Sequence, residues 1–171
     1  MIGTESTAIP WHAAYPPPNN LTKSISRDEV LEMLKRGTKE YILGGFIRGS
    51  INLPAQSVYP SIPTLYQLLK AAGIVKVIWF CASSRGRGPR AAAWFDDYLG
   101  KCHDTDMESL VLSGGIKGWA KAGEEYVSWM DEYDASGKVW GGSRETLDLE
   151  HDGRLVVQIL VDIVDCVNLL P

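Results

Sequence analysis

An α/β fold is the class that the sequence predicts, with an open parallel sheet of about five short strands and helices on both faces. Two apolar, β-branched segments at 74–80 and 109–112 have the composition of buried strands. Amphipathic segments that end at glycines lie between and beside them, as crossover helices of a parallel sheet do. The 171 residues suit one domain with a core of useful size.

The predicted helices carry start and stop signals. Ser26 and Glu29 form a capping-box pattern, and Gly37 supplies the stop of the helix that follows. Ser61 can cap a second helix that has Pro63 in its first turn. The remaining predictions are a helix over 88–99 that starts near Pro89 and stops at Gly100, a helix after Ser113, a helix over 124–134, and short strands at 41–43 and within 47–54.

Both ends of the chain differ in composition from the middle. Residues 1–23 predict an irregular arm that Trp11 and Tyr15 hold against the surface, with a proline-rich partner motif as the alternative. Residues 24–134 form the predicted domain, and 135–171 a polar linker followed by an apolar tail. The spacing of polar residues in the tail suits a helix, whereas its β-branched content suits a strand.

Net charge and cysteine usage limit the partners and the cellular compartment that we expect. A net charge of −4 argues against nucleic acid and anionic membranes as partners. Three cysteines without the spacing of a disulfide framework favour a reducing compartment, so we expect the cytoplasm, with the nucleus as an open alternative. Neither a signal peptide nor a membrane span is predicted. The three histidines lack ligand spacing, so no metal site is expected.

Cys81 is the candidate nucleophile. It ends the strand over 74–80, and Arg87 follows after a loop of small residues, just before a helix N-terminus. Helix N-termini and neighbouring cations favour the thiolate form of cysteine. The loop can curl into a nest of N–H groups for an oxyanion, formed by Ala82, Ser83, Ser84, Arg85, Gly86 and Gly88, with Arg87 as a forked ligand. The alternative is a buried structural cysteine beside solvated arginines.

Three stretches carry a family resemblance. The loop Cys81-Ala-Ser-Ser-Arg-Gly-Arg87 resembles the active-site loop of the rhodanese-homology superfamily. Its seven residues match the branch of cell-division-cycle dual-specificity phosphatases and fungal arsenate reductases, whereas sulfurtransferases have a loop one residue shorter. Residues 44–54 resemble the GG-x-I-x-G-S-x-N-x-P segment of that superfamily, and residues 112–119 its L-x-GG-x-x-x-W segment.

The resemblance implies a rhodanese-like open sheet and a cysteine-dependent reaction. Cys81 would attack the phosphorus of a phosphomonoester or the arsenic of arsenate, while Arg87 and the loop amides hold the oxyanion. No cofactor or metal would be bound. An arsenate reductase would take electrons from glutathione or glutaredoxin, the latter as a partner. A sulfurtransferase that forms a Cys81 persulfide and a non-catalytic interaction module are the alternatives.

Three features depart from the family pattern. Leu43 runs directly into Gly44, where relatives place a central strand, so about ten residues and one core strand are expected to be absent. The loop has no acid, which favours arsenate or aryl phosphates as substrates. The tail after Ala135 has no counterpart in the family; a docking helix, an interaction helix and translated non-coding sequence are the alternatives, with the last favoured.

Cys102 and Cys166 are the other two cysteines. We expect Cys102 to be a loop residue, with a resolving thiol as the alternative, and Cys166 to be a packing residue.

Overall fold

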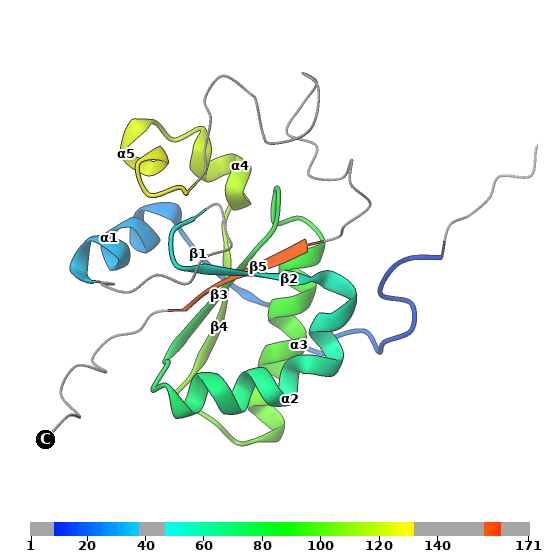
Figure 1. Ribbon diagram of the computed structural model, residues 1–171. Helices are drawn as coiled ribbons and strands as arrows, with labels where there is room; N and C mark the ends of the chain where they lie inside the picture. Colours follow the sequence, from blue (N-terminus) through cyan, green and yellow to red (C-terminus); the bar gives the residue numbers. More distant parts are fainter. Residues whose placement is uncertain (1–8, 38–46, 132–155, 162–171) are drawn as a thin grey trace, which may run out of the picture.

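The computed structural model describes residues 9–37 and 47–131, and the backbone of residues 156–161. These residues form an open five-stranded sheet in the order β1-β4-β3-β5-β2, with helices on both faces (Figure 1). The strands are β1 (Lys23–Ile25), β2 (Ser50–Pro54), β3 (Lys76–Phe80), β4 (Glu108–Leu112) and β5 (Val156–Val161).

Strand direction divides the sheet into two parts. β1, β4 and β3 run parallel, with Lys76 opposite Glu108 and Lys23 opposite Leu110. β5 is antiparallel to both of its neighbours, β3 and β2. The predicted α/β class, with an open sheet and helices on both faces, is therefore confirmed, but one interior strand runs against the parallel direction.

β5 is part of the apolar tail, for which the sequence left a helix and a strand as alternatives. The tail supplies an interior strand, so the strand alternative is the one that the structure contains for residues 156–161. The predicted strand at 41–43 and the junction of Leu43 with Gly44 lie outside the described residues. β1 was not predicted, because its three residues are too few to show an alternating pattern.

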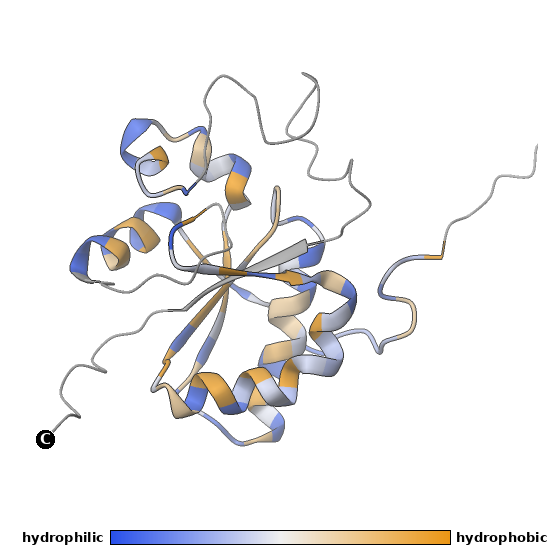
Figure 2. Cartoon of the chain, in the orientation of Figure 1, coloured by the Kyte–Doolittle hydropathy of each residue, from blue (hydrophilic) through white to orange (hydrophobic). Residues whose placement is uncertain are grey.

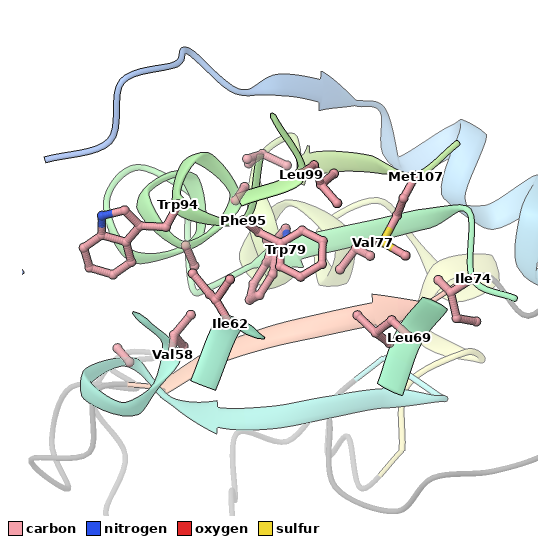
Figure 3. Packing of buried hydrophobic residues seen from close by; sticks show 14 residues of the cluster. Val58, Ile62, Leu69, Ile74, Val77, Trp79, Trp94, Phe95, Leu99 and Met107 are labelled. Atoms are coloured by element: carbon pink, nitrogen blue, oxygen red, sulfur yellow. The ribbon is translucent and has the colours of Figure 1, made fainter. Parts of the chain in front are cut away.

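Alternation along β3 builds a core on each face of the sheet. Val77 and Trp79 belong to the cluster under α2 (Ala55–Ala71) and α3 (Arg87–Lys101), where Trp79 packs against Phe95 with ring centroids 5.5 Å apart (Figure 3). Ile78 and Phe80 face α1 (Arg27–Gly37), α4 (Gly115–Ala120) and α5 (Glu124–Val127). Successive side chains point to opposite faces, so one short strand serves both clusters. The helices that cover the sheet carry both hydrophilic and hydrophobic residues (Figure 2).

Several helix boundaries differ from the predicted ones. α2 begins at Ala55 rather than near Ser61, because Ala55 and Val58 are fully buried against the core and hold the first turns in place. α3 runs through Gly100 to Lys101 instead of stopping at the glycine. α5 ends at Val127, well before 134, because the chain turns so that Met130 can pair with Ile47 in an antiparallel bridge.

The first helix and the arm follow the sequence signals. The Ser26 N–H donates to Glu29 Oε2 at 3.0 Å, and the Glu29 N–H donates to Ser26 Oγ at 3.2 Å, which completes the capping box. In the arm, Tyr15 packs on Tyr59 and donates its hydroxyl to the carbonyl of Gln56 at 2.8 Å. Trp11 packs edge-on against Trp94. These contacts favour the wrapping arm.

Asp104 anchors the turn between α3 and β4. Its carboxylate accepts from Lys70 Nζ at 2.6 Å, from Tyr66 OH at 2.9 Å, and from the backbone N–H groups of Asp106 and Met107. The side chain is only 1% exposed. Hydrogen bonding from Lys70, followed by that from Tyr66, lowers the pKa of Asp104 to about 2. The same contact raises the pKa of Lys70.

Within residues 9–37 and 47–131, no helix combines the length and apolar character that a bilayer crossing needs.

Candidate active site

Cys81 lies at the carboxyl end of β3 and is 6% exposed. The parallel strands β3 and β4 both end at this edge of the sheet, the edge where open α/β folds bind ligands. Residues 81–87, which we call the Cys81 loop, connect the strand to α3. The predicted order of strand, loop and helix is therefore present.

Gly88 brings the start of α3 against the cysteine. Its backbone N–H donates to Cys81 Sγ at 3.4 Å. A Cβ built on this glycine would lie 3.2 Å from the backbone Cα and carbonyl carbon of Phe80, so a larger residue would push the helix away from the strand. The sulfur therefore lies beside a backbone donor and the N-terminus of α3.

The turn between β4 and α4 supports the other side of the Cys81 loop. The N–H of Ile116 donates to the carbonyl of Cys81 at 3.1 Å, and the N–H of Lys117 to the carbonyl of Ala82 at 2.9 Å. Because the N–H and C=O of a trans peptide point in opposite directions, the N–H groups of Ala82 and Ser83 are directed away from α4. Neither of these two amides is therefore directed toward the helix that supports the loop.

The other predicted loop residues differ in exposure. Ala82, Ser83 and Ser84 are half-buried, and Ser84 has a left-handed backbone conformation, with φ of 51°. Such a residue lets a short loop reverse its direction. Arg85 and Gly86 are exposed, whereas Arg87 opens α3 and is half-buried. All the candidate residues are therefore gathered between the end of β3 and the first turn of α3.

Other polar residues from the sequence lie elsewhere. Cys102 caps the carboxyl end of α3, which at a rise of about 1.5 Å per residue is roughly 20 Å from the loop, too far for a resolving thiol. Asp96 and Asp97 accept hydrogen bonds from Asn20 and Asn19 of the arm. These contacts tie the arm to α3 and leave the two carboxylates outside the Cys81 loop.

Sequence reasoning did not assign a role to the β4–α4 turn. The sequence signal for this turn was the pair Gly114-Gly115. Both glycines have positive φ values, 77° and 57°. Only glycine adopts that conformation at low cost, and it lets Ile116 and Lys117 present their amides to the loop. Among the described residues, no three His, Cys, Asp or Glu side chains are grouped as metal ligands.

Comparisons with known proteins point to one kind of relative. The chain is 31% identical over 107 residues to Arsenate reductase 2.2 of Oryza sativa subsp. japonica, an alignment that covers 61% of this chain and 81% of the rice protein. It is 39% identical over 59 residues to Arsenical-resistance protein 2 of Saccharomyces cerevisiae, which covers 34% of this chain and 45% of the yeast protein. No protein-family profile and no solved structure matches the chain.

Proposed function

Because the chain belongs to the rhodanese-like family, in the branch of cell-division-cycle dual-specificity phosphatases and arsenate reductases, we propose that it is a cysteine-dependent arsenate reductase. The observation that carries the proposal is the hydrogen bond from the Gly88 N–H to Cys81 Sγ. The first two carbonyl groups of the adjoining loop accept hydrogen bonds from the backbone of α4. This arrangement suits a thiolate facing an oxyanion. The rice relative named as an arsenate reductase supports the choice of substrate.

Cys81 starts the reaction. Its thiolate attacks the arsenic of arsenate, an As–S bond forms, and an arsenate oxygen leaves as water after taking up protons. Loop amides, with Ala82 and Ser83 first among them, and the Arg87 guanidinium stabilise the negative oxygens as the bond forms. Ser84, Arg85, Gly86 and Gly88 complete the proposed oxyanion-binding loop.

An external thiol completes the reduction. It attacks the sulfur of Cys81, and the As–S bond breaks with its electron pair on arsenic, which leaves as arsenite. The resulting mixed disulfide is reduced by a second thiol, which releases Cys81. Glutathione or glutaredoxin fits this role, and no bound cofactor or metal is required. Cys102 cannot substitute for the external thiol, because α3 separates it from Cys81.

The Cys81 loop favours arsenate over an alkyl phosphate. The six residues from Ala82 to Arg87 include no carboxyl group that could protonate a poor leaving alkoxide. Arsenate at neutral pH already carries protons on its oxygens, which can leave with the departing oxygen as water, and an aryl phosphate loses a stabilised phenolate, so both demand less of a general acid in the loop. Hydrolysis of aryl phosphate by the same thiolate is therefore the second activity to examine.

A parallel assay tests the proposal. Purified protein should form arsenite from arsenate with glutathione and glutaredoxin. Cys81→Ser should lower the rate of arsenite formation by at least about a thousandfold. Cys102→Ser is the matched control and should keep it. Arsenite formation that survives Cys81→Ser, or sulfur transfer from thiosulfate to cyanide in place of arsenate reduction, would contradict the proposal.

A further inference from the structure

β5 occupies an unusual position for a segment so late in the chain. It lies in the interior of the sheet, between β3 and β2, although the element before it in the sequence is α5 (Figure 1). In the described part of the chain, β5 is the only strand that pairs with β2. Among the described residues, the backbone pairing between β2 and the rest of the sheet therefore runs through residues 156–161 alone.

The pairing of β5 with β3 reaches the base of the Cys81 loop. Val77 lies opposite Val161, and Phe80 lies opposite Gln158. Phe80 is the residue directly before Cys81. Without β5, the backbone of β3 would keep a partner on the β4 side alone, and its other edge would be open. The strand that leads into Cys81 would then be paired along one edge only.

A second route connects β5 to the same sulfur through the helices. Val156 pairs with Pro54, the last residue of β2, and α2 begins at the next residue. Buried residues in the first turns of α2 share a hydrophobic cluster with Trp94 and Phe95 of α3. The first turn of α3 carries the Gly88 N–H that donates to Cys81 Sγ. Displacement of β2 would therefore disturb α2, then α3, and finally this contact.

β1, β4 and β3 also have partners other than β5. β1, β4 and β3 pair with each other, and buried residues of α1 and α4 cover one face of them, among them Val30, Leu31, Ile116 and Trp119. β5 itself follows a polar stretch, and its sequence, Val-Val-Gln-Ile-Leu-Val, has strong β propensity. The pairing of β1 with β4 and of β4 with β3 therefore involves no backbone group of residues 156–161.

We propose that the gap between β2 and β3 is a strand-binding site, that the chain fills it with its own residues 156–161, and that occupancy of this site holds the Cys81 loop in its active shape. With β5 seated, β3 is paired on both edges and β2 aligns α2 and α3. With β5 displaced, β2 and the Cys81 loop lose order, while β1 and β4 remain folded. The C-terminal segment is thus an internal activator of the site proposed for arsenate reduction.

Hydrogen exchange on the full-length protein tests the coupling. Ile159→Pro removes a backbone donor from the middle of β5 and should unseat the strand. We expect amide exchange in 50–54 and 81–88 to accelerate by at least about tenfold, and exchange in 108–112 to change by less than about twofold. Asp152→Pro, outside the strand, is the matched control and should leave all three segments unchanged.

Three exchange patterns would overturn the proposal. Faster exchange in 50–54 with no change in 81–88 would mean that β5 does not control the Cys81 loop. A uniform acceleration would mean that β5 is not separable from the rest of the core. No change anywhere would mean that residues 156–161 do not bind between β2 and β3. If the expected exchange pattern is found but the protein does not reduce arsenate, the proposed function is refuted and this inference stands.

A cross-strand disulfide provides the opposite test, since it prevents β5 from leaving. Ile51 lies directly opposite Ile159 in the antiparallel pair, at a separation that disulfides span. Ile51→Cys with Ile159→Cys, in a background of Cys102→Ser and Cys166→Ser, should oxidise within one chain and slow exchange in 81–88 relative to the reduced protein. A covalent dimer on a non-reducing gel would show that the strand comes from a second copy, against the proposal.

Discussion

Gly115 lies so close to Cys81 that a Cβ built on the glycine would be 2.2 Å from the Cys81 carbonyl oxygen. The same Cβ would be 2.9 Å from the carbonyl oxygen of Ala82 and from the amide nitrogen of Ser84. Real side chains do not approach a backbone this closely. The β4–α4 turn and the Cys81 loop are therefore built against each other, and the fit requires a glycine.

Gly115→Ala should disrupt the Cys81 loop. Alanine at φ of 57° costs about 1–2 kcal/mol from backbone conformation alone, and the clash with Cys81 adds to that cost. We expect a loss of at least about 2 kcal/mol in urea unfolding and a loss of most arsenate reduction. Gly118→Ala, in the same helix, is the control, because its Cβ would meet its nearest neighbour, the Ser113 carbonyl oxygen, at an ordinary 3.7 Å. Equal effects of both substitutions would argue against a specific fit.

Gly88→Ala should slow the reaction of Cys81 with iodoacetate at neutral pH. The new Cβ, at 3.2 Å from the Phe80 backbone, forces the first turn of α3 outward and lengthens the hydrogen bond from the Gly88 N–H to the sulfur. Gly100→Ala, near the other end of α3, whose Cβ would meet nothing within 4 Å, should react as the wild type does. An unchanged rate in Gly88→Ala would show that this N–H does not activate the thiol.

The stability of the fold should fall in acid because of Asp104. Its folded pKa of about 2 lies below the ordinary 3.8, so its contribution is complete above about pH 4 and is lost as the pH falls toward 2. The free energy of unfolding, measured in urea across this range, should decline less steeply in Asp104→Asn than in the wild type. Asp106→Asn, at an exposed neighbour, is the control and should keep the wild-type slope.

The arm contributes to stability through Tyr15. Its ring lies 5.0 Å from that of Tyr59 and 5.8 Å from that of Trp94, so Tyr15→Ala should cost about 1–3 kcal/mol in urea unfolding. Tyr15→Phe keeps the ring and loses only the hydrogen bond to Gln56, a smaller cost of about 1 kcal/mol. If Tyr15→Ala and the wild type unfold alike, the arm does not stabilise the domain.

Local signals predicted the parts of the fold that depend on neighbours in sequence. The capping box of Ser26 and Glu29, the buried run of β3 and the passage from Cys81 into α3 each depend on a few adjacent residues. The start of α2 was misplaced because burial of Val58, a tertiary contact, outweighs the proline signals. The site followed the same rule, since the Cys81 loop was visible but the role of Gly115 required a contact between distant segments.

β5 illustrates the limit of sequence patterns most clearly. Six residues with β-branched and polar side chains fit both a helical stripe and a strand, so residues 156–161 stayed ambiguous. No feature of the neighbouring sequence indicates that Gln158 pairs with Phe80 on one side and with Asn52 on the other. The reversed direction of the strand is also a property of the whole sheet, because only the partners define it.

The interior position of β5 also sets the order in which the chain can fold. A ribosome releases β3 and the Cys81 loop long before residues 156–161, so the partly made chain can pair β1, β4 and β3 but has no strand that joins β2 to them. Closing that pair requires contacts between segments far apart in sequence, which form slowly. We therefore expect the Cys81 loop to acquire its final shape only after residues 156–161 have been made, in a late step of folding.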